Sequence, residues 1–149
     1  MKIAIATDHN GVNEKKVLTK ELNEYEIIDM STENTPIDDY PDFAFKVAKS
    51  ITKQEVDFGI LLCGTGIGMS IAANKVKGIR CAHCSNIEQA HLAREHNDAN
   101  IIALSYKQDI NELVTMIKEF IKTQPDSDER HQRRIKKIID YEKGTYNEL

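Results

Sequence analysis

The sequence lacks any apolar run near the length needed to cross a bilayer, which argues against a membrane role. Its N-terminus has neither the apolar core of a secretion signal nor the Arg/Ser-rich character of a transit peptide. With no tryptophan, 40% hydrophobic residues and 30% charged residues, the composition is that of a soluble protein. We therefore expect a cytoplasmic protein.

Cysteine is also scarce. Three cysteines, an odd number spread over 149 residues, do not form a disulfide framework, so we expect free thiols in a reducing compartment. The net charge of −4 argues against nucleic acid as the main partner, although residues 130–134 (RHQRR) are locally basic. A small anionic ligand is compatible with this charge balance.

What the chain does contain is an alternation of apolar runs of strand length with amphipathic stretches of helix length. This alternation predicts one α/β domain with a parallel sheet covered on both faces. Strands are expected at residues 2–7, 25–30, 58–62, 79–83 and 100–104. Helices are expected at residues 12–23, 42–51, 69–75, 87–95, 110–122 and, after a linker, 130–141. The last helix lies outside the alternation, and a partner subunit is one candidate to cover its apolar positions.

A glycine-rich loop follows the third expected strand. Glycines at positions 64, 66 and 68 stand directly after Cys63 and before a helix, a spacing that lets backbone N–H groups converge on an anion. The loop is not a Walker A sequence, because no Gly-Lys-Ser/Thr follows, and it does not match the usual dinucleotide fingerprint on a first strand. On its residues alone it is either an anion cradle or a turn that serves close helix–strand packing.

Three side chains near strand or helix ends are candidates for chemistry. Cys63 ends a buried strand at the edge where open α/β sheets build ligand crevices. The loop amides and the helix dipole would favour its thiolate and make it a base, but a small buried apolar residue is an equally simple explanation of a lone cysteine. Asp8 and His9 end the first strand at the same edge, either as site residues or as a satisfied polar pair. His96 stands among ordinary capping and turn residues.

Two further groups have competing explanations. Arg130 and Arg134 share one helix face, where two guanidinium groups suit a phosphate, but a helix can also simply begin with solvated basic residues. Cys81 and Cys84 stand three apart on an expected strand, so they face opposite sides and are expected to pack in the core. No second cysteine pair and no histidine pair at zinc-ligand spacing accompanies them, so we expect no metal.

Several motifs occur in order along nearly the whole chain, and together they resemble one family. They are Asp8-His9, Asp39-Tyr40-Pro41, residues 63–68, Ala72-Ala73-Asn74-Lys75, Gly78-Ile79-Arg80, residues 96–100 and Arg130-His131-Gln132. The ordered set resembles ribose-5-phosphate isomerase type B, in the family that also holds the galactose-6-phosphate isomerase subunits. The resemblance implies a Rossmann-like three-layer fold with a five-stranded parallel sheet, a homodimer or dimer of dimers, and no metal or organic cofactor.

The resemblance also implies a reaction. Family members interconvert ribose 5-phosphate and ribulose 5-phosphate, a step of the pentose phosphate pathway, through an enediolate. Cys63 matches the base that moves a proton between C2 and C1. The catalytic oxyanion would be held by the backbone amides of Gly64, Thr65, Gly66, Ile67 and Gly68.

Other matches concern the sugar ring. His96 matches the acid that opens the furanose ring. Asp8, Tyr40 and Asn97 match residues that contact sugar hydroxyls or assist opening.

The residues that match the family's phosphate clamp are His9, Arg130 and Arg134. In the family this clamp is assembled partly across the dimer interface. The helix at about residues 129–142 would then pack on the partner subunit. Where the family usually has Gly-x-Arg, this chain has Ser105-Tyr106-Lys107. Lys107 keeps a charge for the phosphate but loses the bidentate fork of arginine.

Two other functions are compatible with these residues. One is isomerisation of a six-carbon sugar phosphate, such as galactose 6-phosphate or allose 6-phosphate, because Lys107 departs from the family pattern. The other is a non-catalytic sensor that binds a phosphorylated ligand in the same loop. Binding to nucleic acid rests only on residues 130–137 and conflicts with the acidic charge balance.

Overall fold

Five strands form a single parallel sheet in the computed structural model, which describes residues 1–148. The strands lie in the order β2-β1-β3-β5-β4. They are β1 (Lys2–Thr7), β2 (Glu26–Asp29), β3 (Phe58–Cys63), β4 (Cys81–His83) and β5 (Ile101–Ser105). At the centre, Ile60 of β3 pairs with Ile5 of β1 on one side and Ile102 of β5 on the other.

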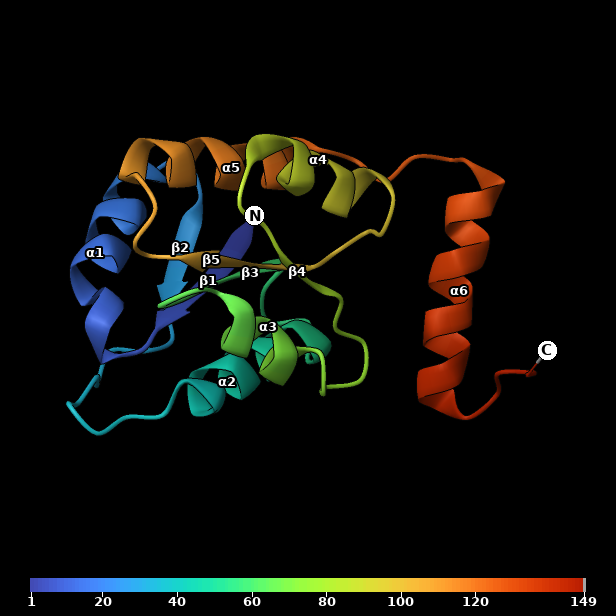
Figure 1. Ribbon diagram of the computed structural model, residues 1–149, viewed down its shortest axis with the longest axis horizontal. Helices are drawn as coiled ribbons and strands as arrows, with labels where there is room; N and C mark the ends of the chain where they lie inside the picture. Colours follow the sequence, from blue (N-terminus) through green and yellow to red (C-terminus); the bar gives the residue numbers. More distant parts are fainter. Residues whose placement is uncertain (149) are drawn as a thin grey trace.

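Helices cover both faces of the sheet (Figure 1). One face carries α1 (Val12–Glu21), α4 (Ile87–Glu95) and α5 (Ile110–Lys122), and the other carries α2 (Tyr40–Thr52) and α3 (Ile67–Ala73). The predicted three-layer α/β architecture with a five-stranded parallel sheet is confirmed. Both α4 and α5 have the predicted bounds, and each begins after an Asn or Asp side chain that accepts backbone N–H groups of its first turn. α2 begins earlier than predicted, at Tyr40, because Pro41 fits the first turn of a helix.

The two faces of the sheet differ in side-chain size. Successive strand residues point to opposite faces, so Ile3 and Ile5 face α1, α4 and α5, whereas Ala4 and Ala6 face α2 and α3. Gly59 of β3 lies on the same face as these alanines, where a Cβ atom would stand only 2.6 Å from Cγ1 of Val47 in α2. The small residues therefore let α2 pack close to the sheet.

The chain reverses its winding direction between β1 and β3, which makes this the switch point of the sheet. From β1 the chain crosses through α1 to β2, whereas from β3 it crosses through α3 toward β4, on the opposite side of the sheet. The loops after these neighbouring strands thus diverge at the carboxyl edge, which is where open α/β sheets bind ligands. Cys63 ends β3 at this point, and Asp8 follows β1.

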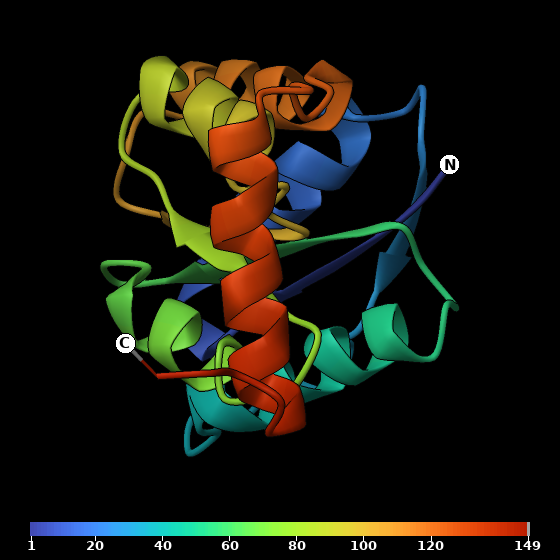
Figure 2. The ribbon, with the colours of Figure 1, turned by 90° about the vertical axis from the view of Figure 1, so that its right-hand side faces the viewer.

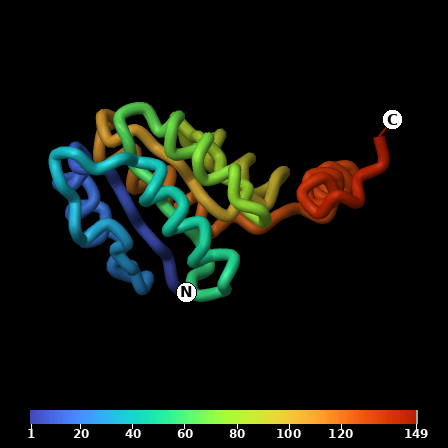
Figure 3. Tube along the Cα trace, turned by 90° about the horizontal axis from the view of Figure 1, so that it is seen from below, coloured from blue at the N-terminus to red at the C-terminus, as the bar shows by residue number. Residues whose placement is uncertain are grey.

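The last helix, α6 (Glu129–Lys143), stands beside the three layers, on the side of the edge strand β4, and runs across them (Figures 1 and 2). Figure 3 shows the linker that carries it away from the sheet. Its one buried side chain is Ile135, while Ile138 and Tyr141 are exposed. The packing of this helix on a partner subunit is still a prediction. No helix within residues 1–148 is both long enough and apolar enough to cross a membrane.

Candidate active site

Cys63 is held by its own loop. Its side chain points toward the α2/α3 face with 6% of the residue exposed, and its Sγ atom accepts a hydrogen bond of 3.1 Å from the Gly66 N–H. Gly66 has a φ of +81°, and a Cβ atom there would lie 2.9 Å from the His83 ring and 3.0 Å from the Leu104 carbonyl carbon. Only glycine suits this backbone conformation and this space. The turn therefore aims one amide at the thiol.

Neighbouring strands fix the rest of the loop. The Ser105 hydroxyl donates to the Gly64 carbonyl at 2.7 Å, and a ring nitrogen of His83 hydrogen-bonds with the Thr65 carbonyl at 2.8 Å. The Thr65 hydroxyl accepts from the Ile67 N–H at 3.1 Å. Of the five amides predicted to hold an oxyanion, those of Gly66 and Ile67 are thus engaged within the loop.

Tyr40 closes one side of the loop. Its ring lies so close to Gly68 that a Cβ atom there would meet the Tyr40 Cζ atom at 2.6 Å. The third glycine of the loop therefore makes room for an aromatic ring. The structure thus brings Tyr40, one of the candidate site residues, together with the Cys63 loop.

Asp8 and His9 lie at the same edge of the sheet. The Asp8 carboxylate accepts from the Asn10 N–H at 3.0 Å and so begins the short 3-10 helix η1 (His9–Gly11). His9 hydrogen-bonds with Asp38 twice, through its backbone N–H at 3.1 Å and through Nδ1 at 2.7 Å. With Nδ1 engaged, Nε2 is the ring nitrogen of His9 that is available to a ligand.

Asp38 was not predicted to matter, yet it holds the loop at residues 31–39 against β1. Its carboxylate also accepts from the Asn34 side chain at 2.9 Å and from the Thr35 N–H at 3.1 Å. Burial alone would raise the pKa of Asp38, but the hydrogen bonds from Asn34, His9 and Thr35 outweigh it, and the pKa lies below its usual value. Asp38 therefore stays ionised and orients His9.

Tyr106 is a second residue that the sequence did not single out. Its ring lies against Gly11, and its hydroxyl lies near Gly64, where a Cβ atom would be 3.6 Å from Oη. Burial, and to a smaller extent the electrostatic influence of the nearby Asp8 and Cys63, raises the pKa of the phenol, so it stays protonated. The sequence did hold a signal for it, because residues 105–107 depart from the Gly-x-Arg that the family usually has. Lys107, its neighbour, is exposed at the same edge, and its N–H donates to the Ser105 hydroxyl.

The remaining predicted residues lie at the other edge of the sheet. His96 ends α4, and Asn97 precedes β5, so both stand at the amino edge of the strands, whereas Cys63 ends β3 at the carboxyl edge. Arg130 and Arg134 follow in the first turns of α6. Within one chain, the structure does not bring these four residues together with Cys63.

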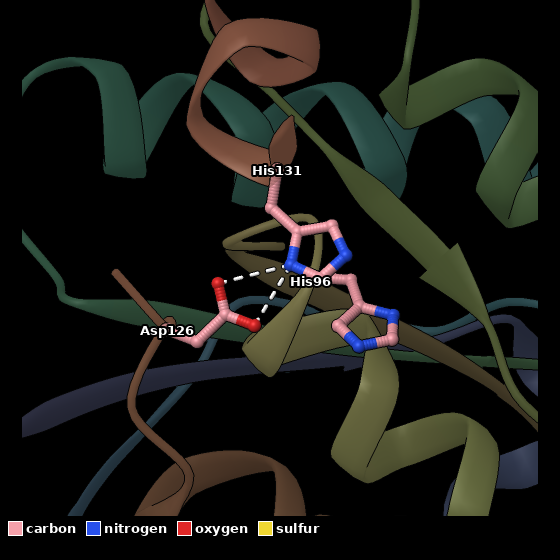
Figure 4. Close-up of side chains that lie close together, drawn as sticks. All are labelled: His96, Asp126 and His131. Carbon is pink, nitrogen blue, oxygen red and sulfur yellow. Dashed lines mark hydrogen bonds and ion pairs between the residues drawn. The ribbon is translucent and has the colours of Figure 1, made fainter. Parts of the chain in front are cut away.

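His96 belongs to a group of three side chains, with Asp126 and His131 (Figure 4). Its ring stacks on that of His131 with centroids 4.0 Å apart and planes at 29°, and His131 Nδ1 hydrogen-bonds with both carboxylate oxygens of Asp126 at 2.8 and 3.0 Å. Arg130 is engaged nearby with Asp128, at 2.8 Å from its Nη2 atom. Neither Asp126 nor His131 was assigned a role from the sequence, although His131 lies beside Arg130.

Comparison with known proteins identifies relatives over nearly the whole chain. The model of the Ribose/Galactose Isomerase family matches residues 3–138. Ribose-5-phosphate isomerase B of Escherichia coli is 42% identical over 139 residues, which are 92% of this chain and 93% of that protein.

Solved structures agree. Ribose-5-phosphate isomerase B of Clostridium thermocellum has a TM-score of 0.91 and 44% identity, covering 97% of this chain and 99% of its own. The enzyme of the same name from Mycoplasma genitalium, solved with bound ribulose 5-phosphate, has a TM-score of 0.88 and 42% identity, covering 95% of this chain and 96% of its own.

The Asp38 hydrogen bonds predict a pH-dependent contribution to stability. Because the pKa is lowered in the folded state, this stabilisation is fully present above the unfolded value of 3.8 and is lost as the pH falls through the folded-state pKa. Asp38→Asn should lower the free energy of unfolding by about 1–3 kcal/mol at neutral pH. Urea unfolding of both proteins measures this difference, which should shrink toward zero in strong acid. An equal loss of stability at neutral pH and in strong acid would contradict the assignment of this stabilisation to the ionised Asp38 carboxylate.

Proposed function

The chain belongs to the ribose/galactose isomerase family, and on this premise we propose that it interconverts D-ribose 5-phosphate and D-ribulose 5-phosphate. The observation that carries the proposal is the position of Cys63, at the switch point between β1 and β3 with an amide N–H aimed at its sulfur. A close structural relative was solved with the ketose product of this reaction bound. Both observations support an aldose–ketose isomerase.

In the proposed reaction, the Cys63 thiolate removes the proton from C2 of the open-chain aldose. The C2–H electron pair forms the C1–C2 double bond, and O1 becomes the oxyanion of an enediolate. The O2 proton then moves to O1, the cysteine returns its proton to C1, and the carbonyl forms at C2. A hydrogen bond from an N–H to an ionised sulfur is stronger than one to a thiol, so the Gly66 amide supports the form that acts as the base.

The oxyanion of the enediolate needs donors that are not already engaged. In the ligand-free loop the Gly66 N–H faces Cys63 and the Ile67 N–H faces Thr65, which leaves the amides of Gly64, Thr65 and Gly68 as the primary donors. Each well-placed donor of this kind contributes about 3 kcal/mol to lowering the barrier. The proposal therefore divides the loop amides between the base and the substrate.

We also propose that the complete site forms between two copies of the chain. One copy would supply the group at the carboxyl edge, Asp8, His9, Tyr40, Cys63 and Lys107. The other would supply His96 as the acid that opens the furanose ring, Asn97 for a sugar hydroxyl, and Arg130 and Arg134 for the phosphate. The support for this arrangement is that the two groups lie at opposite edges of one sheet and that α6 leaves Ile138 and Tyr141 exposed.

A six-carbon sugar phosphate is the second candidate substrate, because Ser105 and Lys107 stand where the family usually has Gly and Arg. We expect kcat/KM for ribose 5-phosphate to exceed those for allose 6-phosphate and galactose 6-phosphate by at least about tenfold, since a site fitted to five carbons misplaces a longer chain. A coupled isomerase assay on the three substrates measures this. Higher kcat/KM for a hexose phosphate would assign the second function, and binding without conversion would indicate a sensor.

Replacing the base tests the chemistry directly. Cys63→Ala should lower kcat for ribose 5-phosphate by at least about 100-fold with little change in KM, because a positioned base contributes this much and the phosphate contacts are untouched. Cys81→Ala is the matched control, since burial raises the pKa of the Cys81 thiol to about 12 and keeps it inert. Near-normal turnover by Cys63→Ala would reject the thiol as the base.

Mixed dimers test the shared site. Cys63→Ala and His96→Asn would each be inactive alone, because every site in either dimer lacks one group. A dimer containing one copy of each, purified through two different tags, would hold one site with both groups intact and should recover about half of the wild-type activity. A mixed dimer no more active than its parents would show that both groups act from the same chain.

A further inference from the structure

Asp126, in the linker before α6, forms hydrogen bonds through its backbone N–H, its carbonyl and its carboxylate. Its backbone N–H donates to the Glu95 carbonyl at the end of α4 at 3.0 Å, and its carboxylate holds His131 of α6. The Gln132 side chain donates to the Asp126 carbonyl at 2.8 Å. Asp126 thus joins the end of α4, which carries His96, to the start of α6. The reaction steps proposed above give this carboxylate no role.

A metal ion is one explanation for two histidines and a carboxylate whose ligand atoms lie within 4.8 Å of one another. The ring geometry speaks against it. A histidine binds a metal through a lone pair in the ring plane, and planes only 29° apart, stacked at 4.0 Å, direct their lone pairs side by side instead of toward one point. Asp126 also lies on a ring nitrogen of His131, which is where a carboxylate that orients a histidine is found.

We infer that Asp126 is a positioning residue for His96 and acts on it through His131. This inference rests on the proposed function, in which His96 opens the furanose ring. Asp126 accepts the Nδ1–H of His131 and so fixes both the tautomer and the plane of that ring. The His131 side chain, only 13% exposed, then forms the surface on which His96 stacks.

His96 needs such a support because of where it stands. It is the C-cap residue that follows α4, where a helix no longer restricts its side chain as an interior turn does. Within residues 1–148 its ring stacks on His131 and makes no hydrogen bond with a side chain or the backbone. When Asp126 releases His131, the His96 ring therefore loses the contact that sets its orientation.

Ring opening can be measured apart from isomerisation. Opening breaks the C1–O4 bond while the acid gives a proton to O4, and the O1 proton leaves as the aldehyde forms. Ribulose 5-phosphate has no such ring to open, because its O5 carries the phosphate and its O4 is too close to C2 to close a five-membered ring. Exchange of its C1 proton with solvent deuterium needs only the base and the enediolate site. The two assays thus separate His96 from Cys63.

The test uses the full-length Asp126→Asn variant. Turnover of ribose 5-phosphate should fall by about 10- to 100-fold, because a misplaced catalytic group loses rate on this scale, whereas C1 exchange of ribulose 5-phosphate, followed by proton NMR in deuterium oxide, should stay within about twofold of the wild type. Asp126→Glu keeps the carboxylate and should recover part of the lost turnover. Asp140→Asn is the matched control, because Asp140 also forms an ion pair on α6, with Lys136 at 2.6 Å, and has a similar side-chain exposure of 27%.

The other outcomes would overturn the inference. If both activities of Asp126→Asn fall together, Asp126 is only structural, and if neither changes, it has no role in the reaction. If chelation abolishes wild-type turnover and zinc restores it, the three side chains are a metal site. If the wild type converts no ribose 5-phosphate, the proposed function fails first, and the inference with it.

Discussion

All five strands run in the same direction, so their carboxyl ends meet at one edge of the sheet and their amino ends at the other. The positions of the candidate site residues at the strand ends follow from this alignment. Cys63 and Asp8 follow strands and lie at the carboxyl edge, while His96 and Asn97 precede β5 and lie at the amino edge. No local adjustment of a loop brings the two groups together, because a full strand length separates them. Pairing of two copies is the arrangement that we propose to unite them.

Features with a local cause were predictable from the sequence, and those with a distant cause were not. Asn86 and Asp109 cap α4 and α5, so the bounds of both helices could be predicted. The glycines of the Cys63 loop likewise indicated a tight turn. Asp38, by contrast, stands 29 residues from His9, and only the folded chain brings them to 2.7 Å. The Asp126–His131 contact spans five residues, but it depends on how the linker after α5 packs against the end of α4.

The loop after β3 shows why a glycine-rich motif recognised in the sequence does not determine which of its backbone amides can bind a ligand. The sequence assigned all five amides of residues 64–68 to an oxyanion. The structure divides them, because the left-handed turn at Gly66 directs its N–H back to the thiol and the Thr65 hydroxyl occupies the Ile67 N–H. A cysteine is a useful base only when its ionised form is stabilised, so in the reaction that we propose this division serves the base as well as the substrate.

The separation of α6 from the three layers also bears on how substrate choice can change. In the proposed reaction the reacting carbons face a loop packed against α2 and α3, whereas two of the proposed phosphate contacts, Arg130 and Arg134, lie on a helix with one buried side chain. A small shift of that helix alters the span between base and phosphate without disturbing the core. On this proposal, the length of the sugar that the protein accepts can change through substitutions that move α6, at the periphery of the molecule, while the residues around Cys63 stay the same.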